Sequence, residues 1–128
     1  MSTEQRLRPL NYLEHILKSV RLARGYIEGL DRTEFLEDLK TQQAVILNIL
    51  IIGEAAIQLA HEDPDFVASY PQIPWKQMRG MRNRLAHGYF DINLDIVWDT
   101  VHQSLPMLEQ QIHDLLQSLE RPIGGPSE

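Results

Sequence analysis

Apolar residues recur at three- and four-residue steps through the first part of the chain, which places them on one face of an α-helix. They predict a helix near 7–29, with Gly29 marking its end. The positions are Leu10, Leu13, Ile16, Leu17, Val20, Ala23 and Ile27.

A second helical region is predicted near 33–62. Asp31, with Glu34 three residues later, is typical of a capping box at its start. A break is possible near 38–41, and Asp63-Pro64 should end the helix, because proline pushes the preceding residue out of the helical region.

The stretch 44–60 is the most apolar of the chain, but Asn48, Glu54 and Gln58 interrupt it. A membrane span needs about 20 predominantly apolar residues, so we predict a buried core helix and no membrane association.

Two more helices are expected near 74–87 and 94–119. Pro74 suits the first turn of the former, and Gly88 would end it as a left-handed residue. Asp91 or Asn93 would cap the latter, and Pro106 should kink it.

No segment alternates polar and apolar residues as a strand would, and no internal repeat is visible. The fold class is therefore all-α, an antiparallel bundle of four to five helices. Its 128 residues suit one domain, here 1–120, and 121–128 hold two prolines and two glycines and indicate a flexible C-terminal tail.

The chain has no cysteine, which excludes a disulfide framework, a zinc site built on thiolates and a thiol nucleophile. The arginines near the N-terminus precede no apolar run, so no signal peptide is expected. Both features fit a cytoplasmic protein.

Charge is unevenly distributed. The net charge is −6, yet residues 66–90 contain no Asp or Glu, while the rest of the chain carries eight basic and eighteen acidic residues. The basic window suggests a local site for an anion, or else a cluster that merely pairs with an acidic neighbour. Its cations are Lys76, Arg79, Arg82 and Arg84.

Arg82 and His87 are the candidate catalytic pair within this window. Histidine moves protons near neutral pH, and arginine offers a planar fork of donors that fits phosphate oxygens. Such a pair, with no metal or other cofactor, suits RNA cleavage in which the 2′-hydroxyl is the nucleophile. The alternative is a satisfied core histidine beside a solvated arginine.

Helix geometry limits how this pair could meet. Five residues correspond to about 140° around a helix, so Arg82 and His87 do not share a face, whereas Asn83 and His87 do. Convergence of the two side chains therefore requires a helix end at His87 or a second copy of the chain.

Glu54, an acid within an apolar helix, should pair with one of the window's arginines as structural support. A metal at His61–Asp65 is disfavoured, because its ligands are consecutive.

The segment Met81–Phe90 resembles the HepT-like branch of the HEPN superfamily, whose motif is an arginine, a polar residue, three further residues, a histidine, any residue and a tyrosine. Arg82, Asn83, His87 and Tyr89 match it position by position. Ile52–Ala56, Tyr70–Trp75, Gly80–Asn83, Val97-Trp98 and Leu105-Pro106 also resemble family signatures, so the likeness covers roughly 10–119.

The resemblance implies a homodimer with a shared Arg–His cleft and metal-independent RNA cleavage that leaves a 2′,3′-cyclic phosphate. It further implies the toxin of a type VII toxin–antitoxin system, acting on an RNA such as tRNA or mRNA. The cognate antitoxin would be a minimal nucleotidyltransferase that attaches AMP to Tyr89. The alternative is a non-catalytic subunit that binds a nucleotide phosphate for a nucleotidyltransferase through Arg82 and His87, and a plain dimeric scaffold is a third possibility.

Overall fold

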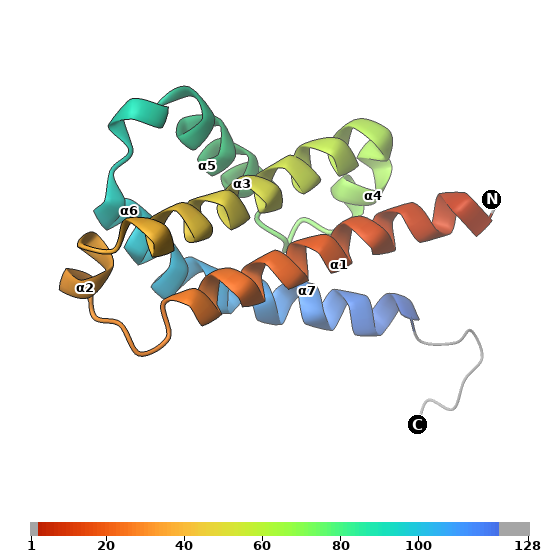
Figure 1. The fold of residues 1–128 in the computed structure, drawn as a ribbon. Helices are drawn as coiled ribbons and strands as arrows, with labels where there is room; N and C mark the ends of the chain where they lie inside the picture. The colour runs from red at the N-terminus through yellow and green to blue at the C-terminus, as the bar shows by residue number, and fades with distance from the viewer. Residues whose placement is uncertain (1–2, 121–128) are drawn as a thin grey trace.

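The computed structural model describes residues 3–120, except for the side chains of residues 3–7 and of Tyr89. Within that range the chain is all-α and contains no strand, which confirms the predicted fold class (Figure 1). The α-helices are α1 (Thr3–Tyr26), α2 (Arg32–Leu36), α3 (Leu39–Glu62), α4 (Pro64–Ser69), α5 (Trp75–His87), α6 (Leu94–Asp99) and α7 (Leu105–Glu120). A 3₁₀ turn (Tyr89–Asp91) precedes α6, and a π-helical segment (Thr100–Ser104) joins α6 to α7. The proposed tail, 121–128, lies outside the described residues.

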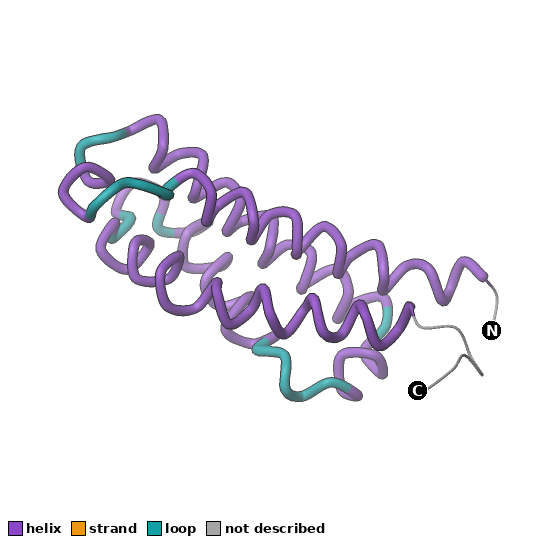
Figure 2. Tube along the Cα trace, turned by 90° about the horizontal axis from the view of Figure 1, so that it is seen from below, coloured by secondary structure: helices purple, strands orange, loops and turns teal. Residues whose placement is uncertain are grey.

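The long helices form an antiparallel bundle. Helix α1 packs along both α3 and α7 and runs opposite to both of them, while α5 packs on α3 (Figures 1 and 2). Helix α3 is therefore central, and its buried face meets α1 on one side and α5 on the other. The largest fully buried side chains are Phe35, Leu13, Ile16, Leu59, Ile73, Ile112, Val20, Val45, Val97 and Val101.

Local hydrogen bonds set several helix boundaries as the sequence predicts. Asp31 and Glu34 form the capping box, with each side chain accepting from the other residue's backbone N–H. The break expected near 38–41 is present but lies at Glu37 and Asp38, because α2 ends at Leu36 and the Asp38 side chain accepts from the Thr41 N–H at the start of α3. Asp63 ends α3 and caps α4.

Gly88 follows the end of α5 as predicted, but the predicted left-handed backbone at this glycine is wrong. Helix α5 does end at His87, but Gly88 has a φ of −101°, which is not left-handed. A side chain is excluded there by space instead, since a Cβ on Gly88 would lie 2.9 Å from the carbonyl oxygen of Arg84. The residue is glycine because the backbone passes close to the preceding turn.

Two helices differ in extent from the prediction. Helix α1 begins at Thr3, before the expected start near residue 7. The expected helix over 94–119 is capped by Asn93 but is interrupted by the π-helical segment just before Pro106. Pro106 has no N–H to donate to the carbonyl four residues back, and the wider π turn accommodates that gap.

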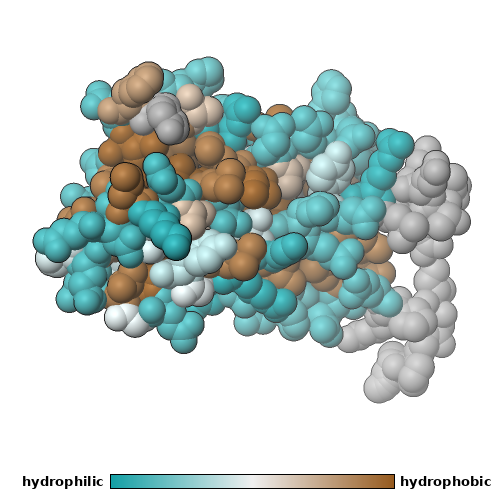
Figure 3. Space-filling view, in the orientation of Figure 1, coloured by the Kyte–Doolittle hydropathy of each residue, from teal (hydrophilic) through white to brown (hydrophobic). Residues whose placement is uncertain are grey.

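Helix α3 is long and apolar enough to cross a membrane by length and composition alone. It is instead the core helix of the bundle, as predicted, since its apolar residues pack under α1 and α5. Part of its apolar surface is not covered, however. Leu47 is 57% exposed and Ile51 is 38% exposed, and Figure 3 shows hydrophobic side chains gathered along this half of α3 and toward α5.

Candidate functional site at the α3–α5 crossing

The site lies where α5 crosses α3 at Gly53. A Cβ built on Gly53 would lie 2.1 Å from the Cβ of Arg82 and 2.7 Å from the carbonyl oxygen of Met78. No side chain fits in that space, so the two helices approach this closely only because residue 53 is glycine. The stem of Arg82 therefore lies directly on the backbone of α3.

The guanidinium of Arg82 is held from two sides. Its Nη2 lies 3.1 Å from Oε1 of Glu54, and its Nη1 donates to Oδ1 of Asn83 at 3.0 Å. Gln58 in turn donates to the other carboxylate oxygen of Glu54 at 2.9 Å. The predicted pairing of Glu54 with an arginine of the basic window is confirmed, and the arginine is Arg82.

This arrangement orients Arg82 without enclosing it. Its side chain is 32% exposed, and that of Glu54 is 45% exposed. The guanidinium carries five N–H donors, so Nε–H and the outward N–H groups stay available to a phosphate. A charge fixed in direction and open to solvent suits the binding of an anion.

His87 is the last residue of α5 and is exposed. Among the described residues its imidazole has no hydrogen-bond or ion-pair partner, and no such contact joins it to Arg82. The helix is regular up to His87, so the two candidate residues point in different directions within one chain. Asn83 stands one turn before His87 and shares its face.

Tyr89 follows immediately, in the 3₁₀ turn Tyr89–Asp91. Its side chain lies outside the described part of the structure. Phe90, its neighbour, is 98% exposed.

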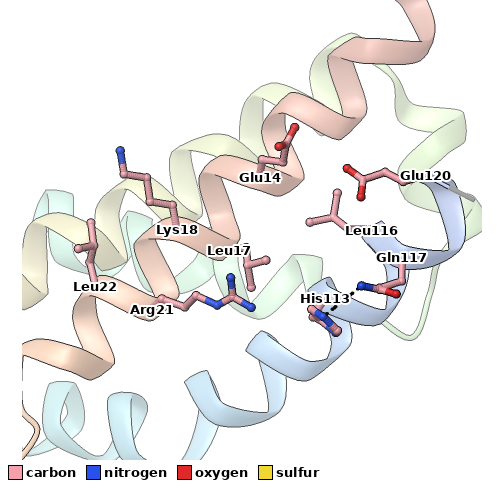
Figure 4. A pocket seen from close by; sticks show the side chains of 9 residues that line it. All are labelled: Glu14, Leu17, Lys18, Arg21, Leu22, His113, Leu116, Gln117 and Glu120. Carbon is pink, nitrogen blue, oxygen red and sulfur yellow. Dashed lines mark hydrogen bonds between the residues drawn. The ribbon is translucent and has the colours of Figure 1, made fainter.

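The groove beside Arg82 differs in charge from another hollow on the molecule. The groove has a volume of about 690 Å³ and runs between α3 and α5, with Lys76, Arg79 and Arg82 in its lining. The other hollow, of about 510 Å³, lies between α1 and α7 (Figure 4). That hollow is lined by charges of both signs, namely Glu14, Lys18, Arg21 and Glu120, and so favours no anion.

Acidic residues near His61 do not gather around it. Glu62 accepts a hydrogen bond from Tyr12 and pairs with Arg8 of α1, while Asp63 caps α4. The described residues contain no group of three or more histidines and carboxylates placed to hold a metal.

Sequence reasoning missed the role of Gly53. The signal was the glycine within the otherwise apolar stretch, directly before Glu54. A helical glycine often marks a close approach, but nothing local to the sequence names the partner.

The model of the family described as "Ribonuclease HepT-like" matches residues 16–115, which is most of the chain. The chain belongs to this family. The match includes the Arg82–His87 segment and the whole α3–α5 crossing.

Several relatives are similar over most of their length. Two carry the name "putative RNase": one from Methanocaldococcus jannaschii is 38% identical, over 85% of this chain and 88% of its own, and one from Caldanaerobacter subterraneus is 36% identical, over 85% and 95%. A protein of Thermococcus cleftensis named "probable ribonuclease HepT" is 36% identical, over 82% and 93%. No solved structure is significantly similar.

Proposed function

We propose that this protein is an endoribonuclease whose active site is built from Arg82 and His87. The observation that carries the proposal is the oriented, solvent-open guanidinium of Arg82 on a surface of net positive charge. Five residues later stands His87, which is exposed and has no partner among the described residues. Family membership and the names of the relatives point to the same chemistry.

The RNA supplies the nucleophile in this reaction. The 2′-hydroxyl oxygen attacks the adjacent phosphorus, the bond to the 5′ oxygen breaks, and the products are a 2′,3′-cyclic phosphate and a 5′-hydroxyl. One proton must leave the 2′-hydroxyl and one must reach the 5′ oxygen, and an imidazole can mediate such transfers near neutral pH. Arg82 stabilises the charge that develops on the phosphoryl oxygens, with Asn83 in a supporting role. No metal takes part in this scheme.

The active form we propose is a homodimer, because Arg82 and His87 diverge within one chain. The exposed Leu47 and Ile51 are spaced to lie on the same face of α3 as Glu54, the partner of Arg82. A second copy that covers this apolar surface would therefore lie next to Arg82 and could bring its own His87 to it. Apolar surface of this kind is what an isologous interface buries.

In the cell, we propose, the protein is the cytoplasmic toxin of a type VII toxin–antitoxin pair. A minimal nucleotidyltransferase would be the antitoxin and would transfer AMP to the hydroxyl of Tyr89, with release of pyrophosphate from ATP. The modified residue is two positions from His87, so the added nucleotide would fill the RNA site and place a negative charge beside it.

A second function uses the same residues without cleavage. Arg82 and His87 could hold a nucleotide phosphate for a partner nucleotidyltransferase, and the ion pair between Arg82 and Glu54 is compatible with simple anion binding. The two functions differ in whether purified protein cuts RNA.

The deciding experiment incubates the purified chain with total tRNA in EDTA. We expect cleavage by the wild type, and loss of at least about 100-fold in rate in Arg82→Ala and in His87→Ala, since each removes a group that acts in the transition state. Both variants should keep the wild-type circular dichroism and should no longer inhibit growth when expressed. Full cleavage by either variant, or no cleavage by the wild type, would overturn the assignment.

A further inference from the structure

We infer that the groove between α3 and α5 is a subsite for the sugar–phosphate backbone of the RNA, on one side of the phosphate held by Arg82. This inference rests on the proposed ribonuclease function and deepens it. The lining of the groove includes Ala60 and His61 of α3 and Lys76, Arg79, Arg82 and Asn83 of α5. Arg82 and Asn83 belong to the candidate site as well, so the groove begins at the reacting phosphate.

The cations of the groove stand in a row along α5. Lys76, Arg79 and Arg82 are spaced by three residues, which is close to one helical turn and a rise of about 4.5 Å per step. Successive positive charges at that interval can each meet a phosphate of a strand laid along the helix. The row leads from Arg82 toward the N-terminal end of α5.

Two of these charges, those of Lys76 and Arg79, are not neutralised within the part of the protein that the structure describes. Within the described residues, neither Lys76 nor Arg79 takes part in an ion pair, whereas Arg21, Arg24 and Arg32 on other faces all do. An arginine that is paired with carboxylates has fewer N–H donors and less uncompensated charge available to a phosphate. The free cations of the groove are therefore available to a polyanion.

The nearby acids face elsewhere. Glu62 is engaged by Tyr12 and Arg8 on the α1 side, and the side chain of Asp63 caps α4. Glu54 stands at the Arg82 end, where its charge is already paired. On a chain with a net charge of −6, this groove is a local positive surface suited to a strand of phosphates.

The test measures RNA binding in a His87→Ala background, so that the RNA is not cut. The probe is a short fluorescent single-stranded RNA, and the readout is the dissociation constant across a range of salt concentrations. The groove variant is Lys76→Gln with Arg79→Gln. The matched control is Lys18→Gln with Lys40→Gln, which removes the same charge from α1 and from the far end of α3, about 30 Å from Ala60 along the helix.

We expect the groove variant to bind the RNA about tenfold more weakly. A plot of the logarithm of the association constant against the logarithm of the salt concentration should become less steep. The magnitude of its slope should fall by about 1.4, because two phosphate contacts are lost at about 0.7 each for a single strand. The control should stay within about twofold of the parent. Arg79→Lys, which keeps the charge, should retain most of the affinity. In the cutting enzyme, the loss should be larger in KM than in kcat.

The outcomes separate this inference from the proposed function. If the wild type cuts tRNA but the groove and control variants bind RNA equally, the groove is no subsite and the ribonuclease assignment stands. If the groove variant keeps its RNA affinity but no longer binds the antitoxin, the groove is a protein-docking surface instead. If the wild type neither binds nor cuts RNA, both proposals fail.

Discussion

At the scale of single residues, the site depends on the lack of a side chain at Gly53 as much as on the side chain of Arg82. The missing side chain of Gly53 lets the stem of Arg82 lie on α3, and Glu54 and Asn83 then fix the guanidinium. The direction of the Arg82 guanidinium is thus set by a backbone contact and two polar partners.

Gly53→Ala should therefore damage both stability and activity. The added methyl group would lie 2.1 Å from the Cβ of Arg82, so the helices must separate. We expect a loss of about 1–3 kcal/mol in the free energy of unfolding, as for other overpacked cores. A displacement of Arg82 by about 1 Å can cost about 100-fold in cleavage rate. Urea titration and the tRNA assay measure the two effects.

Gly25→Ala is the control for this change. Gly25 is also helical, but a Cβ there meets nothing within 4 Å, so that variant should be as stable as the wild type or slightly more so. Wild-type cleavage by Gly53→Ala would show that the close crossing does not position Arg82.

Tyr89→Phe should separate modification from catalysis. The hydroxyl is the only group removed, so the Arg–His pair is untouched and cleavage should stay within about threefold of the wild type. The variant should gain no AMP after incubation with the antitoxin and ATP, which intact-mass spectrometry would show as a missing increment. The hydroxyl has a reference pKa of about 10, so the antitoxin must supply the activating base. Adducts on Tyr12, Tyr26 or Tyr70, with Tyr89 bare, would contradict the proposal.

At the scale of helices, α1 and α7 are joined by a charged clamp. Glu109 of α7 accepts from Arg21 at 3.1 Å and from Arg24 at 2.5 Å. Burial raises the pKa of Glu109, but the hydrogen bonds and charges of Arg24 and Arg21 outweigh it, and the pKa lies below its usual value. The clamp therefore contributes to stability while Glu109 is ionised.

The sign of this shift predicts a pH dependence. The contribution is fully present above the unfolded pKa of about 4.3 and is lost as pH falls through the lower, folded pKa. Glu109→Gln should lower stability at neutral pH by about 1 kcal/mol or less, since the arginines are half exposed. It should also flatten the decline of stability on the acid side. Thermal melts from pH 7 to pH 3 test this, with Glu14→Gln as a control without an ion pair in the described structure. An unchanged acid decline in Glu109→Gln would exclude the clamp as its cause.

At the scale of the whole molecule, the apolar strip of α3, formed by Leu47 and Ile51, adjoins the Arg82 site that we propose two chains share. The exposed Leu47 and Ile51 would cost solvation free energy in a monomer, and they lead to Glu54 and Arg82. A two-fold interface there would bury the strip and join the two halves of the site at once.

Mixing two inactive variants tests this shared site. If Arg82 of one chain acts with His87 of the other, a heterodimer of Arg82→Ala and His87→Ala contains one intact site. Random exchange should then restore about a quarter of wild-type cleavage, since half of the dimers are mixed and each has one of two sites. No restoration after verified subunit exchange would place both residues of a site in one chain.

A charge placed in the apolar strip of α3 tests the proposed shared site in a second way. Ile51→Asp should give monomers in sedimentation and should abolish cleavage, because a buried charge opposes the interface. Leu22→Glu, at an exposed apolar residue on α1, should change neither property. A monomeric wild type at micromolar concentration would rule out the shared site.

The amino-acid sequence by itself determined the long helices and several of their ends, because apolar periodicity, the capping box at Asp31 and the proline at 64 act over four residues or fewer. It also singled out the Arg82–His87 segment and the need of Glu54 for a cationic partner. Only the tertiary structure decided that this partner is Arg82, that Gly53 is the point of closest approach, and that Gly88 is required by space rather than by a left-handed backbone. It alone showed which arginines are paired with carboxylates and which cations remain free. The physical reason is that Arg82 lies 29 and 28 positions from Gly53 and Glu54, and Glu109 lies 88 and 85 positions from Arg21 and Arg24. The packing of α5 and α1 against their neighbours, not any local pattern, selects which of these side chains meet. The contact at Gly88 spans only four residues, and there the path of the backbone at the end of α5 decides.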